Sequence, residues 1–109
     1  MRSITLATLL VLASAVPAVA SAQATGDAAA GKLKAYTCTG CHGITGYRNV
    51  YPHYHVPRIS GQNYQYLVTA LNAYKTGQRK HPTMAAQAQS LTEQDIADIA
   101  SYLAAPTSP

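Results

Sequence analysis

Cys38-Thr39-Gly40-Cys41-His42 places two thiols and an imidazole within five consecutive residues of a 109-residue chain. On a helix, Cys38 and Cys41 stand three positions apart, so both sulfur atoms face the same edge of a planar group. The pattern is typical of covalent c-type haem attachment, in which each thiol adds to a haem vinyl group and the histidine ligates the iron. The motif therefore predicts Cys38 and Cys41 as haem anchors and His42 as an iron ligand.

Three other uses of a cysteine pair compete with haem attachment: a redox dithiol, a disulfide and half of a zinc site. A thioredoxin-like dithiol would follow a strand and open a longer helix. A zinc ribbon would need a second cysteine pair, whereas this chain has only two cysteines. The sequence favours haem over all three.

Residues 1–22 have the pattern of an export signal. Arg2 gives a positive start, Ile4 to Val16 forms a mostly apolar run, and Ala20-Ser21-Ala22 offers small residues to a signal peptidase. We expect cleavage after Ala22, with a cut after Ala20 as the alternative. An uncleaved membrane anchor is a second alternative, but the run is shorter than the roughly 18 apolar residues that favour a spanning helix.

Residues 23–109 are sufficient for one small domain. Chains of this size bury a modest core and usually need a staple, which a covalently attached haem would supply. The whole chain carries a formal net charge of +4, which is too mild to indicate nucleic-acid binding.

Three helices are expected, over Asp27 to about Thr39, Gln62 to Thr76 and Thr92 to Ala104. The second carries an apolar stripe at helical spacing and is followed by Gly77, while the third starts with a capping-box pattern. Gly31 interrupts the first, either because another helix approaches closely there or because a glycine is merely tolerated. The prediction is an all-α fold, with three principal helices around the haem.

Glycine and proline break the pattern between Gly43 and Gly61, where tyrosine and histidine rings are frequent. We expect this segment to be a loop that folds against one face of the haem and buries its tyrosine rings. His53 and His55 are possible rival iron ligands or metal ligands, but no third ligand recurs at metal spacing. Partly exposed ring residues are the simpler interpretation.

Met84 would be the only methionine left once the signal with Met1 is removed. It follows His42 by 42 positions, in the segment Lys80-His81-Pro82-Thr83-Met84, which we expect to be irregular. A thioether opposite an imidazole favours reduced iron and raises the potential, as electron transfer in cytochromes c requires. The alternative is that Met84 only fills a gap in the core.

The residues resemble a class I cytochrome c, most closely one domain of the bacterial cytochrome c4 type or a small one-haem relative. The matching segments run in the family's order over most of residues 23–109: Gly26 to Gly31, Cys38 to Gly43, Pro57 to Gln62, Tyr66-Leu67, Tyr74 to Gly77, Pro82 to Met84 and Leu91 to Tyr102.

The resemblance implies one covalent haem c per chain, attached outside the cytoplasm and hence in the periplasm. It implies Cys38 and Cys41 as thioether anchors, His42 as the proximal ligand and Met84 as the distal ligand. It also implies that the Pro57 carbonyl accepts a hydrogen bond from the His42 ring, and that the first and last helices cross. Two-haem members of the type repeat the domain, whereas this chain does not, and its loop from Tyr47 to His55 is longer than the usual turn.

The expected function is electron transfer by cycling between Fe(II) and Fe(III), with unknown redox partner proteins and without a small-molecule substrate or enzyme activity. Basic residues at Arg58, Lys75, Arg79 and Lys80 are candidates for a docking rim that steers an acidic partner. Two alternatives stay open: a haem subunit of a larger oxidoreductase, and a ligand-binding or peroxidase-type haem protein.

Overall fold

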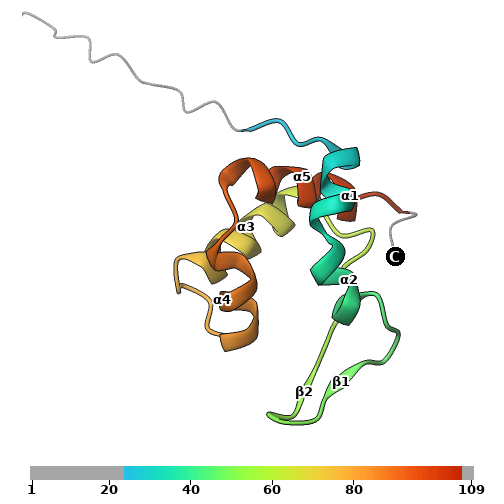
Figure 1. Ribbon diagram of the computed structural model, residues 1–109, viewed down its shortest axis with the longest axis vertical. Coiled ribbons are helices and arrows are strands. Elements are labelled where there is room, and N and C mark those ends of the chain that lie inside the picture. Colours follow the sequence, from blue (N-terminus) through green and yellow to red (C-terminus); the bar gives the residue numbers. More distant parts are fainter. Residues whose placement is uncertain (1–23, 107–109) are drawn as a thin grey trace, which may run out of the picture.

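The computed structural model describes residues 24–106, so the predicted export signal lies outside the described residues. The described chain is mostly helical, with one short two-stranded hairpin (Figure 1). The elements are, in order, α1 (Ala28–Lys34), α2 (Tyr36–His42), β1 (Arg48–Asn49), β2 (Tyr54–His55), α3 (Tyr64–Lys75), α4 (Pro82–Gln89) and α5 (Glu93–Leu103). The all-α prediction is confirmed, although the first expected helix is broken in two and the segment around Met84, expected to be irregular, is a helix.

The first expected helix is two helices in the structure. Asp27 caps α1 by accepting hydrogen bonds from the backbone N–H groups of Ala29 and Ala30. The break falls at Ala35, whose ψ of 1° leaves the helical range and whose side chain is completely buried in the core. The break separates the cysteine motif, on α2, from the helix that crosses the core.

The segment expected to be irregular around Met84 is helix α4. His81 is its N-cap, and Pro82 occupies the first turn, where a missing backbone N–H costs nothing. The following alanines favour a helix, and Ala88 is completely buried. Met84 therefore sits in the first turn of a helix and not in a loop.

The hydrophobic core lies between α3 and α5. Ile96, Ile99 and Leu103 of α5 are its largest fully buried side chains, and Leu67 of α3 packs with the last two. The predicted capping box of α5 is present, because the Thr92 hydroxyl and the Asp95 carboxylate each accept the other residue's backbone N–H. The two helices predicted from apolar spacing are thus confirmed within two residues at each end.

Helices α1 and α5 pack closely against each other, and Figure 1 shows them crossing. A Cβ atom added to Gly31 would lie 1.9 Å from the carbonyl oxygen of Asp98, and one added to Gly26 would lie 2.1 Å from that of Ala97. Gly31 is therefore required by the packing of another helix, the first of its two interpretations. The predicted crossing of the first and last helices is also confirmed.

Replacing Gly31 by alanine is expected to destabilise the protein. The added methyl meets backbone and not a flexible side chain, so α1 must shift away from α5, at a cost of about 1–3 kcal/mol. Gly40→Ala is the matched control, because nothing lies within 4 Å of the Cβ position there; it should be neutral or gain up to about 1 kcal/mol of helix propensity. Thermal unfolding of both variants measures the difference, and equal melting temperatures would contradict the close crossing.

A polar cluster also ties α1 to α5. The ammonium of Lys34 lies 2.7 Å from Asp95 Oδ1 and 2.5 Å from Asp98 Oδ2. Asp98 is only 3% exposed, and it also accepts hydrogen bonds from the backbone N–H of Asp27 and the amide of Gln94, each at 2.8 Å. These hydrogen bonds lower the pKa of Asp98 to about 2, and the bond from the backbone of Asp27 has the largest effect. The bond to Lys34 lowers the pKa of Asp95 as well.

The cluster makes stability depend on pH in a defined window. A carboxyl with a lowered folded pKa stabilises the fold above its unfolded value, 3.8 for Asp98, and that contribution disappears as the pH falls toward about 2. The raised pKa of Lys34, caused first by Asp95, gives stability that is complete below 10.5 and lost at higher pH. Melting temperatures of the wild type should fall between pH 4 and 2, and those of Asp98→Asn should be lower at neutral pH and fall less. Parallel curves for the two proteins would contradict the role of Asp98.

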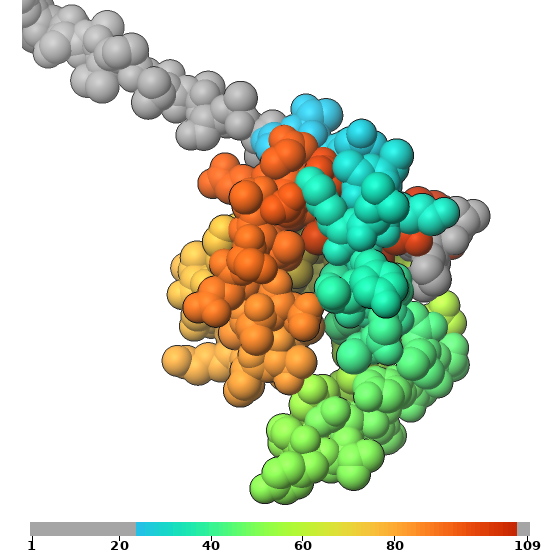
Figure 2. All heavy atoms as spheres, viewed as in Figure 1, coloured from blue at the N-terminus to red at the C-terminus, as the bar shows by residue number. Residues whose placement is uncertain are grey.

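The Tyr- and His-rich segment forms a hairpin and not a plain loop. β1 and β2 are antiparallel, with Arg48 opposite His55 and Asn49 opposite Tyr54, and the hairpin projects from the helical body (Figures 1 and 2). Tyr51 at its tip is 94% exposed, so the expectation that the tyrosines of this segment are buried is wrong for Tyr51. Among residues 24–106, no helix is long and apolar enough to cross a membrane.

Candidate haem site

Helix α2 presents the cysteine motif to a large cavity. Cys38 and Cys41 are both free thiols, half-buried, and line this cavity together with His42. Its volume is about 390 Å3, within the range of roughly 300–1,000 Å3 typical of cofactor and ligand pockets. The helical spacing that the motif requires is therefore present beside a space of suitable size.

The cavity extends between two sides of the molecule. α2 and the hairpin form one side and α3 and α4 the other, and the space-filling view shows an opening between α4 and the hairpin (Figure 2). Its apolar lining comes from Val56, Ile59, Leu67, Leu71, Ile99 and Leu103. The apolar stripe predicted on the second helix thus lines this space as well as the core. An apolar slot with a thiol edge fits a flat, largely hydrophobic macrocycle.

The His42 ring is oriented by one strong hydrogen bond. Its Nδ1 lies 2.6 Å from the carbonyl oxygen of Pro57, and since a carbonyl only accepts, Nδ1 carries the proton and donates it. The lone pair is then on Nε2, the atom free to bind a metal. The hydrogen bond that the family resemblance implied is therefore present, and it is the usual way of fixing a ligating imidazole.

Met84 lines the same cavity from α4. Its side chain is half-buried, and its backbone N–H donates to Nδ1 of the capping His81 at 3.4 Å. The two residues predicted as axial ligands thus reach one cavity from elements on its two sides.

The alternatives for the cysteine pair are not supported by their surroundings. Burial raises the pKa of the Cys38 thiol, whereas reactive dithiols have a lowered one. Within residues 24–106, no group of three or more His, Cys, Asp or Glu side chains is arranged to hold a metal ion. The surroundings of the described thiols therefore give no support to a redox dithiol or to a zinc site.

The cavity residues were predicted only in part. Tyr54 and His55 belong to the segment expected to fold against the haem, and both line the space, whereas His53 is exposed and does not. Tyr66, Tyr74 and His81 also line it and were not predicted to do so. The spacing of Tyr66 and Tyr74 on one helix was a usable signal, since one stripe can face a pocket as well as a core. For Tyr54, the sequence predicts a segment that lies against the haem but not which of its tyrosines reaches the cavity, because the fold of the hairpin decides this.

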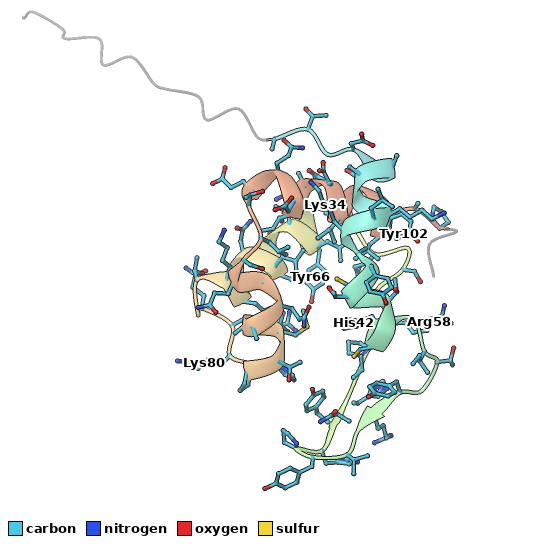
Figure 3. The ribbon with its side chains drawn as sticks, in the orientation of Figure 1. Lys34, His42, Arg58, Tyr66, Lys80 and Tyr102 are labelled. Atoms are coloured by element: carbon cyan, nitrogen blue, oxygen red, sulfur yellow. The ribbon has the colours of Figure 1, made fainter. Side chains whose placement is uncertain are left out.

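The four candidate docking residues do not form one continuous rim. Arg79 packs over the Tyr74 ring at 4.9 Å and donates to the Tyr66 hydroxyl at 3.2 Å. Lys80 lies beside α4, but Arg58 lies on the opposite side of the molecule, beyond α2 (Figure 3), where it donates to Thr45 Oγ1. Lys75, near the end of α3, donates to the Leu91 carbonyl oxygen. A shared surface is therefore restricted to the side of the molecule that holds α3 and α4.

Comparisons with known proteins agree with this geometry. The family model for cytochrome c matches residues 28–105. Cytochrome c-554(548) of Halomonas halodenitrificans is 46% identical over 80 residues, which cover 71% of this chain and 93% of that protein. The cytochrome subunit of sulfide dehydrogenase from Chlorobaculum tepidum is 33% identical over 72 residues, covering 66% and 62% of the two chains.

A solved structure shows the same fold. The crystal structure of reduced recombinant cytochrome c4 from Pseudomonas stutzeri superposes with a TM-score of 0.60 and 32% identity. The match covers 73% of this chain and 45% of that one, so the chain spans less than half the length of this cytochrome c4. The chain belongs to the cytochrome c family, as a class I member of the c4 type.

Proposed function

We propose that this protein is a periplasmic mono-haem electron carrier. Residues 1–22 would direct export and be removed near Ala22, and residues 23–109 would form the single cytochrome c domain. Members of the family carry covalently attached haem c and transfer electrons rather than convert a substrate. In this chain, Cys38 and Cys41 would bind the haem as thioethers.

One observation supports the proposal above all others: His42 and Met84 line one apolar cavity, and the hydrogen bond from His42 to Pro57 leaves Nε2 available. When bound, haem supplies an iron that alternates between the ferric and ferrous states. The chain's part is to hold an imidazole and a thioether on it, to exclude water with the apolar walls, and to change little between the two states. Because helices and hydrogen bonds already hold the ligand side chains, the site should reorganise little when the iron changes its oxidation state.

Spectroscopy of the exported, haem-loaded protein tests this function. An electron carrier should be low-spin in both oxidation states, should titrate as one reversible one-electron couple, and should bind carbon monoxide only slowly. A ligand-binding or peroxidase-type protein would instead have a high-spin ferric state and would bind carbon monoxide at once. These two results would favour the ligand-binding or peroxidase-type protein over an electron carrier.

A second candidate is a haem subunit of a larger oxidoreductase. It is favoured by the likeness to the Chlorobaculum sulfide dehydrogenase cytochrome subunit. Affinity purification from the native periplasm distinguishes the two functions, because a stoichiometric flavin or metal subunit would copurify with a subunit and not with a carrier.

Docking is proposed on the side of the molecule that holds α3 and α4, where Lys75, Arg79 and Lys80 lie. Lys80 is exposed, so its charge would attract an anionic partner at low salt. With ascorbate as the anionic reductant, Lys80→Gln should lower the rate of haem reduction about twofold, as expected for one surface charge. The control is Lys32→Gln, because Lys32 is an exposed lysine on α1. Equal effects of the two substitutions, or rates insensitive to ionic strength, would refute this docking surface.

A further inference from the structure

The segment from Tyr54 to Pro57 contacts both sides of the candidate haem site. At its end, the Pro57 carbonyl holds the His42 ring. At its beginning, the Tyr54 hydroxyl lies 2.9 Å from Thr83 Oγ1, the residue before Met84. One short stretch of chain is therefore hydrogen-bonded beside each proposed iron ligand.

The packing of α4 shows why the contact on the Met84 side matters. The backbone of α4 lies close to α3 and to no other described helix or strand. The two strands of the hairpin are likewise close only to each other. Both elements thus border the cavity with little support from the rest of the backbone, and elements with few such contacts open most easily. The Tyr54–Thr83 hydrogen bond joins them.

A second contact of Tyr54 reaches the same turn of α4. Its ring meets the His81 ring edge-on, with 4.6 Å between the centroids, in an arrangement that aromatic pairs prefer. His81 is the N-cap of α4, and its Nδ1 accepts the backbone N–H of Met84. Tyr54 thus contacts His81 through its ring and Thr83 through its hydroxyl, and both residues lie within the three positions before Met84.

We propose that Tyr54 is a positioning residue for Met84. By binding Thr83 and packing on His81, it holds the first turn of α4 against the hairpin, which keeps the thioether in place and slows its release. This role rests on the proposed ligation by Met84. It also gives one tyrosine of the Tyr47 to His55 segment a function that its exposed neighbour Tyr51 does not share.

Release of the thioether is measurable in the haem-loaded ferric protein. Imidazole can bind the iron only after Met84 leaves, so the limiting rate at high imidazole concentration reports Met84 release. Tyr54→Phe keeps the ring and removes the hydroxyl, while Thr83→Val removes the other partner at nearly constant shape. Each of these substitutions should raise the limiting rate on the order of fivefold, which corresponds to the net free energy of one hydrogen bond. The double variant should be no faster than either single one, because both lose the same bond.

Tyr51→Phe is the matched control, since it removes a hydroxyl from the same hairpin at a 94% exposed position; its rate should equal that of the wild type. Unchanged rates in Tyr54→Phe and Thr83→Val, or an equal rise in Tyr51→Phe, would overturn the positioning role. The weak long-wavelength absorption of methionine bound to ferric haem is recorded in the same samples. Its absence from the wild type would overturn Met84 ligation together with this inference, whereas its presence with unchanged rates overturns the inference alone.

Discussion

Met84→Ala is expected to convert the haem from a six-coordinate electron-transfer centre into one with an open or water-filled position. The weak long-wavelength absorption of the ferric protein should disappear, and the ferrous protein should bind carbon monoxide rapidly. The reduction potential should fall on the order of a hundred millivolts, because the thioether stabilises the ferrous state and axial ligands together span about 0.8 V.

Met84→Leu separates ligation from packing. Leucine fills much the same volume, so the fold and the apolar wall are kept while the sulfur is removed. If Met84 ligates the iron, the leucine variant should behave like the alanine variant in absorption, carbon monoxide binding and potential. A leucine variant with wild-type properties would show that Met84 only fills space.

The paired substitution Cys38→Ser and Cys41→Ser is expected to abolish covalent haem attachment completely. A serine hydroxyl cannot form the thioether bond to the haem. Acidified organic solvent should therefore extract all the haem, and the mass of the denatured chain should be that of the polypeptide alone. The protein should also be far less stable, because a small domain loses its covalent staple. Each single substitution leaves one thioether and should keep some haem on the chain.

Thr39→Ser is the control for this experiment, since Thr39 lies between the two cysteines on α2 and only donates its hydroxyl to the Tyr36 carbonyl oxygen. It should retain its haem through denaturation. Covalent haem that survived in the paired cysteine variant would refute the assignment of the anchors.

The parts of the fold that sequence predicts well are those set by local patterns. The apolar spacing of α3 and the capping box of α5 act within a few residues, so both helices were placed within two residues at each end. The break at Ala35 was missed because nothing in the local propensity ends a helix there; the cause is burial in the core. The sequence did contain a signal for helix α4, because Pro82 is followed by alanines and proline is favoured in the first turn of a helix. The segment was nevertheless expected to be irregular.

The candidate site divides in the same way. The haem-attachment residues Cys38, Cys41 and His42 are close together in the sequence, so their joint role can be predicted without knowledge of the fold. Met84 was identified by elimination and by family resemblance, which does not show that α4 presents it to the cavity. The segment of Tyr54 was expected to lie against the haem, but the contacts of Tyr54 with Thr83 and His81 could not be predicted, since they join segments that are far apart in the chain.

The most direct test of a haem held between His42 and Met84 uses the composition of the chain. The sequence has two methionines, Met1 and Met84, so the mature protein should carry Met84 alone. After labelling with 13C-methyl methionine, the spectrum of the exported ferrous protein should contain one methyl resonance, shifted far upfield by the ring current of the haem directly above it. A single resonance at the ordinary methionine position would show that Met84 is not a ligand and would contradict the proposed site.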